Sequence, residues 1–165
     1  MEQRIAKLYE SHGQRLSAFL VGMVGDRDAA EDLVQETFAR ALAADARFEP
    51  LARQSTWLFT IARNLAVNHL ARKRVTAGHP LAEAASGEPD PAVAAEMREA
   101  GGAIRAAVER LSVDHREVFL LKAIEGLTYR EIAETIGVPI GTAQSRFHYA
   151  AAAIRERLSS EGAGI

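Results

Sequence analysis

An aromatic residue, two amides and several cations follow one another at helical spacing between Ser55 and Val75. Trp57, Asn64 and Asn68 are separated by seven and four residues, which places them along one flank of a helix. Aromatic stacking, amide hydrogen bonds to base edges and cation contacts to phosphates are the means by which proteins hold single-stranded nucleic acid. The cations available for phosphate contacts are Arg63, Arg72, Lys73 and Arg74.

The same stretch also has a purely structural interpretation. Trp57 can belong to a hydrophobic core, and cations at the C-terminal end of a helix are stabilised by the helix macrodipole. Residue types and spacing therefore leave both interpretations open. The formal net charge is -2, whereas a protein that binds nucleic acid unaided is usually basic. Either the positive charge is local, or a partner supplies most of the affinity.

The element that must position these residues is a helix over 55–75, capped by Ser55 or Thr56. Its core stripe is predicted to consist of Leu58, Ile61, Ala62 and Leu65. A second amphipathic helix is predicted upstream, over 26–42. Its apolar face holds Val34, Phe38, Ala41 and Leu42, and its acidic face holds Glu31, Asp32, Gln35 and Glu36. Such a face is usually solvated surface, and the alternative is docking to a basic partner.

The C-terminal part predicts a helix, a tight corner and another helix. Thr128 and Glu131 can form a capping box, Gly137 suits a left-handed stop, and Pro139 favours a new helix that runs to about Leu158. The inward residues of the two helices are predicted to be Ile132, Ala133, Ile136, Ala143, Phe147, Ala150, Ala151 and Ile154.

Two more helices are predicted just upstream, around 104–111 and 113–123, and Ser112 is expected to cap the second of them. Together these elements form the helix-turn-helix pattern, whose second helix enters the DNA major groove. The alternative is an ordinary pair of helices in a core. The capping box, the glycine, the proline and the small residues that open the second helix coincide here, and they favour DNA binding.

The whole chain is predicted to be all-α, with two small helical domains over 1–75 and 98–165. The stretch 76–97 contains three of the five prolines and few large apolar residues, so it is expected to be a flexible linker. No cysteine is present, and the N-terminus shows no apolar run typical of a signal peptide. No run reaches membrane-spanning length, so we expect a soluble, cytoplasmic protein.

An enzyme is not expected. The histidines are scattered without metal-ligand spacing, at His12, His69, His79, His115 and His148. No glycine-rich phosphate loop is present, and no cofactor, metal or small-molecule substrate is expected.

Three segments, in this order, resemble the bacterial RNA polymerase sigma factors of the extracytoplasmic-function (ECF) group. The stretch DAAEDLVQETFARAL is similar to the polymerase-binding helix of that family, and STWLFTIARNLAVNHLARKR is similar to its promoter-melting and −10-reading helix. The stretch LSVDHREVFLLKAIEGLTYREIAETIGVPIGTAQSRFHYA is similar to its −35-reading domain. The short length also fits, because this group keeps only the two minimal domains.

The resemblance implies partners and roles. Asp32, Gln35 and Glu36 would dock on the clamp of core RNA polymerase. Residues 48–56, with Asn64 and Asn68, would hold an extruded base of the −10 element of promoter DNA. Trp57, Arg63 and the cations Arg72, Lys73 and Arg74 would lie near the melted strand. The −35 contacts would come from Thr142, Gln144, Ser145, Arg146, His148 and Tyr149. The linker would thread toward the polymerase active-site channel, and an anti-sigma factor is a further implied partner.

The helix predicted to read −35 bases departs from the family pattern. The family usually has Lys or Arg at the position of Gln144, and Arg at the positions of Tyr149 and Ala151. These losses favour a weak or unusual −35 contact and leave two alternatives to a working sigma factor. One is a sigma-like decoy that binds an anti-sigma factor or polymerase with little DNA binding. The other is a stand-alone helix-turn-helix repressor, which does not explain the first block.

Overall fold

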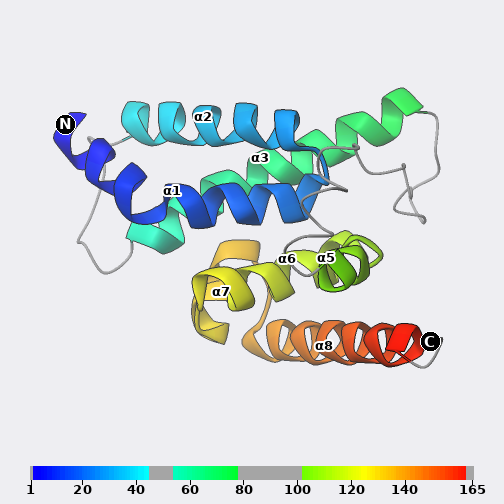
Figure 1. The fold of residues 1–165 in the computed structure, drawn as a ribbon. Helices are drawn as coiled ribbons and strands as arrows, with labels where there is room; N and C mark the ends of the chain where they lie inside the picture. The colour runs from blue at the N-terminus through cyan, green and yellow to red at the C-terminus, as the bar shows by residue number, and fades with distance from the viewer. Residues whose placement is uncertain (1, 45–53, 78–101, 163–165) are drawn as a thin grey trace.

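The computed structural model describes residues 2–44, 54–77 and 102–162 (Figure 1). Its helices are α1 (Glu2–Val24), α2 (Arg27–Ala44), α3 (Gln54–Ala77), α5 (Gly102–Glu109), α6 (Val113–Leu120), the π-helical turn η3 (Leu121–Glu125), α7 (Tyr129–Ile136) and α8 (Ile140–Gly162). These ranges contain no β-strand, which confirms the all-α prediction. The first three helices form one domain and α5 to α8 form the other, as Figure 1 shows.

The first domain packs around aromatic side chains from α1 and α3. Phe19 and Phe59 are fully buried, and their ring centroids lie 5.5 Å apart in an edge-to-face arrangement. The predicted stripe of α3 is buried at Leu58, Ala62 and Leu65, with Ile61 partly buried against the core.

Three expectations about this domain need correction. Leu42 is 39% exposed and not part of the buried face of α2, because it lies at the edge of the stripe whose last buried residue is Ala41. Ser55 and Thr56 lie inside α3, which begins at Gln54, so neither is its N-cap residue. Thr76 and Ala77 belong to α3, and the rest of the predicted linker lies outside the described residues. Residues 48–53 of the expected base-binding segment also lie outside the described residues.

The corner of the helix-turn-helix is built as its residues predict. The Thr128 hydroxyl accepts a hydrogen bond from the Glu131 backbone N–H at 3.2 Å, and a Glu131 carboxylate oxygen accepts one from the Thr128 N–H at 3.4 Å. Gly137 has φ 73° and donates its N–H to the Ala133 carbonyl at 2.9 Å. The Pro139 carbonyl then accepts the first bond of α8, from the Thr142 N–H at 3.0 Å. Ser112 caps α6 by accepting from the His115 N–H at 3.3 Å.

Removal of the Thr128 hydroxyl should cost stability. We expect Thr128→Ala to lower the free energy of unfolding by about 1 kcal/mol, because the Glu131 backbone N–H at the start of α7 loses its side-chain acceptor. Thr76→Ala is the matched control, since the Thr76 hydroxyl only donates to the Arg72 carbonyl inside α3. Urea denaturation followed by circular dichroism measures both variants. Equal losses in the two would contradict a capping role.

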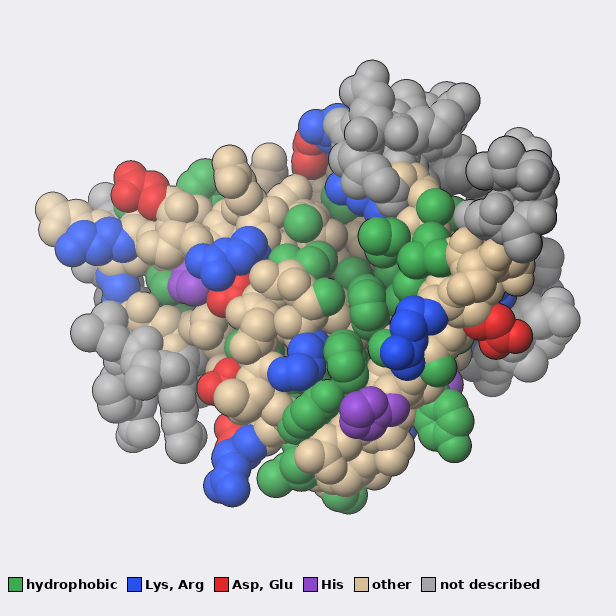
Figure 2. Space-filling model, turned by 60° about the horizontal axis from the view of Figure 1, so that its bottom comes forward, with side chains coloured by type: hydrophobic (Ala, Val, Ile, Leu, Met, Phe, Trp, Pro, Cys, Tyr) green, Lys and Arg blue, Asp and Glu red, His purple; other side chains and the backbone are tan. Residues whose placement is uncertain are grey.

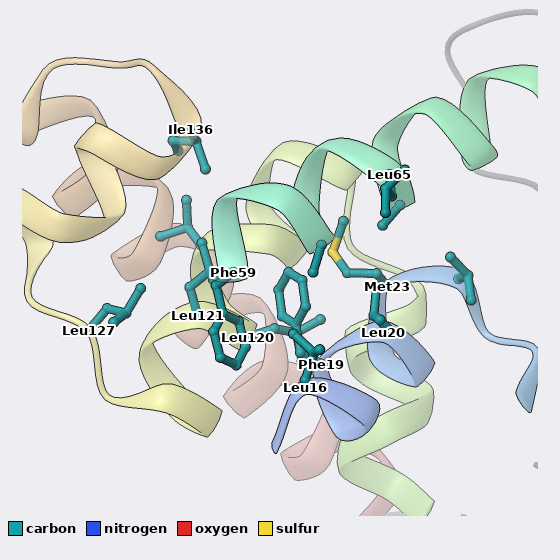
Figure 3. Packing of buried hydrophobic residues seen from close by; sticks show 14 of the residues in the cluster. Leu16, Phe19, Leu20, Met23, Phe59, Leu65, Leu120, Leu121, Leu127 and Ile136 are labelled. Atoms are coloured by element: carbon teal, nitrogen blue, oxygen red, sulfur yellow. The ribbon is translucent and has the colours of Figure 1, made fainter. Parts of the chain in front are cut away.

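The two domains share one continuous core, which Figure 3 shows around Phe59 and Leu121. Leu120 lies against Gly22 of α1, where an added Cβ would come within 2.9 Å of both Leu120 methyl groups. The buried Arg116 of α6 donates a 2.7 Å hydrogen bond to the backbone carbonyl of Met23 in α1. A glycine at 22 therefore lets α1 and α6 approach closely, and a charged hydrogen bond fixes the contact.

Candidate nucleic-acid interface

The two amides predicted to hold a base lie on the surface of α3. Asn64 and Asn68 are exposed and one helical turn apart, so their side chains can reach the same ligand. Trp57 is half-buried and packs against the hydrophobic core, so it combines a core contact with a partly accessible ring. The two interpretations of this residue are therefore compatible.

Arg63, predicted to contact the melted strand, is engaged by the second domain. Its Nε donates to a carboxylate oxygen of Glu117 at 2.6 Å and its Nη2 to the other at 3.2 Å. The remaining Nη1 donates to the Asn64 side-chain oxygen at 3.2 Å. Burial raises the pKa of Glu117, and the hydrogen bonds and positive charge of Arg63 oppose that rise. Arg63 therefore joins the surface of α3 that carries Asn64 to the neighbouring helix α6.

The C-terminal end of α3 carries the remaining cations. Arg72 and Lys73 are exposed and Arg74 is half-buried, so positive charge gathers at the end of the helix. His69 lies one turn earlier, and its pKa is lowered by burial and then by the positive charges of Lys73 and Arg72. A negatively charged strand at this end would be attracted by these cations.

On α8, the side chains predicted to read DNA occupy its first three turns. Gln144, Ser145 and His148 are exposed, whereas Thr142 and Arg146 are half-buried. Ser145 donates its hydroxyl to the Gly141 carbonyl at 2.9 Å. The closest approach of the Arg146 guanidinium to the Asp114 carboxylate is 4.0 Å. The start of α8 is therefore accessible but offers few cations.

A large aromatic side chain is exposed on the solvent side of α8. Tyr149 is 69% exposed, and its ring stacks on that of His115 with centroids 6.1 Å apart. With Ser145, His148 and Ala152 it lines a shallow hollow. On the face that comes forward in Figure 2, cations lie apart from one another and hydrophobic side chains gather between them. This surface suits contacts to bases better than a dense set of phosphate contacts.

Sequence reasoning missed the residues of α6 that lie between the two predicted surfaces. Glu117 contacts Arg63 of α3, and Asp114, one turn earlier, faces Arg146 of α8. A signal for Glu117 was present, because it occupies a position on the apolar stripe formed by Val113, Leu120, Leu121 and Ile124. A carboxylate in such a stripe is rarely buried without a partner.

The acidic residues of α2 point away from the core. Asp32, Gln35 and Glu36 are all exposed, while Leu33, Val34 and Phe38 are buried on the other side. Glu36 forms a surface ion pair with Arg40 of the next turn at 2.8 Å. This face leaves carboxylates available to a basic partner surface, and the ion pair with Arg40 is of the weak, solvent-screened kind.

Comparison with known proteins assigns both domains. Residues 8–76 match the family model of Sigma-70 region 2, and residues 101–154 match that of Sigma-70, region 4. The chain belongs to the ECF RNA polymerase sigma factors. It is 34% identical over 151 residues to the ECF RNA polymerase sigma factor EcfG of Rhodopseudomonas palustris. This match covers 90% of this chain and 81% of the relative. It is 32% identical over 158 residues to the RNA polymerase sigma factor CarQ of Myxococcus xanthus, covering 92% and 87% of the two chains.

A sigma factor of known structure has the same fold. The sigma factor RpoE of Bartonella quintana, crystallised in complex with the anti-sigma factor NepR, superposes with a TM-score of 0.76. It is 27% identical in sequence, and the match covers 96% of this chain and 98% of that one. Sigma factors are transcription regulators rather than catalysts. Among the residues described for this ECF sigma factor, no helix is long and apolar enough to cross a membrane.

Proposed function

We propose that this sigma factor binds core RNA polymerase in the cytoplasm and directs it to promoters by reading the −10 and −35 elements. The single observation that carries the proposal is the exposed pair Asn64 and Asn68 beside the cations of α3, in a chain whose domains match sigma regions 2 and 4. The described surface of α3 offers the amide and cation contacts that a melted strand requires.

Melting of the −10 element would be coupled to its recognition on α3. Extrusion of a base from a duplex costs on the order of a few kcal/mol, and contacts that only the extruded base can make offset that cost. Asn64 and Asn68 would supply such contacts, while Arg72 and Lys73 would hold the phosphates of the same strand. Sequence reading and strand opening would then be one event, because the wrong base would leave the cost uncompensated.

Recognition of the −35 element would depend on α8. Gln144 can bind adenine through two hydrogen bonds, and Tyr149 offers a ring and Ala152 a methyl group to the apolar parts of bases. The small number of cations would make this contact weak by itself and reduce its dependence on salt. Tethering through polymerase would compensate, because a linked site experiences a high effective concentration of its target.

Docking to core polymerase is expected to use the acidic face of α2. The double variant Asp32→Lys/Glu36→Lys should weaken binding to core RNA polymerase by roughly 10-fold or more, because it reverses charges that face a basic partner. Fluorescence anisotropy with labelled protein measures the affinity at two salt concentrations. Glu10→Lys, an exposed reversal on α1, is the control. Equal affinity of all three proteins would rule out docking through α2.

Transcription with a randomised promoter library tests the function as a whole. The protein is combined with core RNA polymerase, and the templates that yield transcripts are sequenced. Enrichment of a paired −35 and −10 motif is the expected result. Enrichment of a −10 motif alone would mean that α8 does not read bases, and no enrichment despite polymerase binding would contradict the proposal.

A sigma-like decoy is the second candidate function. The observation that favours it is the cation-poor start of α8, where Gln144, Tyr149 and Ala151 replace the cations expected there. We propose in either case that an anti-sigma protein binds this chain, since the similar RpoE was crystallised with NepR. The exposed amides of α3 argue against a decoy, because binding to a protein alone does not require them. Firm polymerase or anti-sigma binding without transcription would favour it.

A further inference from the structure

We propose that Tyr149 reads the C5-methyl group of a thymine in the −35 duplex, and that His115 of α6 is a positioning residue that holds the Tyr149 ring for this contact. The hollow lined by Ser145, His148, Tyr149 and Ala152 is called the α8 hollow below. The inference rests on the proposed function, because it takes α8 as the helix that meets the −35 element. It adds the base that is read and a residue outside α8 on which the reading depends.

The Tyr149 ring is open to solvent but supported by a ring from another helix. It stacks on the ring of His115, with an interplanar angle of 18°. His115 is half-buried in the first turn of α6, where its backbone N–H donates to the Ser112 hydroxyl. Offset stacking of two rings is favourable beyond the surface area that it buries. The stack therefore favours one orientation of a side chain that would otherwise exchange between rotamers in water.

The second ring that lines the α8 hollow also has a partner on another helix. His148 lies against Tyr129 of α7, with ring centroids 6.5 Å apart. Tyr129 is itself held from two sides, by the Phe147 ring at 5.9 Å and by the Lys122 ammonium 4.5 Å from its centroid. Both rings of the hollow are thus supported by neighbouring helices. A surface formed in advance loses less side-chain entropy when its ligand binds.

The chemistry of the α8 hollow matches a methyl group. Tyr149 supplies an aromatic face and Ala152 supplies a methyl group. The Ser145 hydroxyl donates its hydrogen to the Gly141 carbonyl, so that hydrogen is not available to a base acceptor. Among the four bases only thymine presents a methyl group in the major groove, whereas guanine is recognised by donors to its O6 and N7. The hollow therefore favours thymine over guanine.

The charge and size of this surface favour duplex DNA over a protein as its occupant. Residues 140–155 of α8 include no Asp or Glu, so these residues do not repel the phosphates of an approaching duplex. On α6 the Asp114 carboxylate is 4.0 Å from the Arg146 guanidinium and weakens the attraction of that cation for phosphates. Recognition then depends more on base edges. Four residues line the hollow, which is small for a stable protein interface of about 20–30 residues a side.

Nuclear magnetic resonance on the free protein tests the positioning role of His115. The chain has three tyrosines, so selective labelling of tyrosine rings gives few signals, and Tyr149→Phe identifies those of Tyr149. Ring currents of the stacked imidazole should displace the Tyr149 ring signals. His115→Ala should return them toward the values of free tyrosine, while His115→Phe, which keeps a ring, should leave them displaced. Unchanged Tyr149 signals in the His115→Ala protein would overturn the positioning role.

A binding selection identifies the base that is read. The chain is combined with core RNA polymerase and duplexes whose −35 element is randomised, and the bound duplexes are sequenced. We expect a thymine position that Tyr149→Ala loses, His115→Ala weakens and His115→Phe restores. Tyr9→Ala is the matched control and should keep the thymine. It removes another exposed tyrosine ring, whose partner ring on Phe38 lies 5.1 Å away in the first domain.

Replacement of that thymine by uracil isolates the methyl group. Uracil pairs as thymine does and lacks only the C5-methyl group, so the unmodified protein with polymerase should bind the uracil duplex about 4-fold less tightly. The Tyr149→Ala protein should bind both duplexes equally, and the Tyr9→Ala protein should keep the difference. Equal binding of the unmodified protein to the two duplexes would overturn the proposal.

The outcomes separate this inference from the proposed function. A −35 motif without a thymine that depends on Tyr149 would refute the inference and leave the proposed function intact. No −35 motif at all would refute both the inference and −35 reading. The thymine motif without transcription in the library experiment would support the inference and contradict the proposed function. A loss of polymerase affinity in Tyr149→Ala with unchanged base preferences would mean that the hollow binds protein, and it would overturn the inference.

Discussion

Replacement of Arg116 by methionine should lower the free energy of unfolding by about 3–5 kcal/mol, the largest stability effect we expect from one substitution, because each buried carbonyl left without a donor costs about 1–3 kcal/mol. Arg116 is 6% exposed and donates to four backbone carbonyls. The shortest bonds are 2.6 Å to Glu109 and 2.7 Å to Met23. Methionine fills similar volume but donates nothing, so the loss reflects carbonyls left without a donor. Burial lowers the pKa of Arg116, yet a guanidinium stays protonated in proteins.

Urea denaturation of the Arg116→Met and Arg110→Met proteins checks this expectation. Arg110 lies on the exposed side of the same corner, and its replacement should change stability by no more than about 0.5 kcal/mol. The two variants remove the same group, so the difference between them isolates burial and hydrogen bonding. A loss below about 1 kcal/mol for Arg116→Met would mean that water can replace the guanidinium at these carbonyls.

The double variant Asn64→Ala/Asn68→Ala should reduce transcription from a −10-dependent promoter by about 100-fold or more. Each amide that binds a base edge through two hydrogen bonds is worth about 1–3 kcal/mol of discrimination, and both are lost here. Because the two side chains are exposed, the free energy of unfolding should stay within about 0.5 kcal/mol of the original value. The effect should therefore be on promoter opening alone.

Single-round transcription and a fluorescent base placed in the −10 element measure this loss at the step of strand opening. Gln14→Ala, which removes an exposed amide from α1, is the control and should transcribe normally. Polymerase affinity is measured in parallel by anisotropy and should be unchanged. Normal opening by the double variant would show that α3 binds the strand through its cations and not through its amides.

Local chemistry explains which elements of the fold could be predicted from the sequence. The capping box at Thr128, the cap at Ser112 and the left-handed Gly137 all involve partners within four residues, and all are confirmed. The end of α8 is different, because it continues to Gly162, beyond the predicted Leu158. A polar tail of small residues gives no clear stop signal, so its helix boundary could not be predicted well.

The candidate site was predictable to the extent that it lies on single helices. The exposed positions of Asn64 and Asn68 follow from the periodicity of α3, and their role stays a prediction. The interface between the domains was not predictable, because its contacts join residues far apart in the chain. Arg63 and Glu117 are 54 residues apart, and no local pattern links them. A buried charge on an apolar stripe indicates that a partner exists but does not identify it.

The bond between Arg116 and the Met23 carbonyl also constrains how the chain is made. The two residues are 93 positions apart, so at a synthesis rate of about 5–20 residues per second the donor follows its acceptor by roughly 5–20 s. During that interval the nascent first domain exposes the surface around Gly22 that Leu120 later covers. A protein that binds the surface around Gly22 on the ribosome would compete with the second domain for it. Docking of the two domains therefore depends on the order of translation as well as on the affinity of the domains for each other.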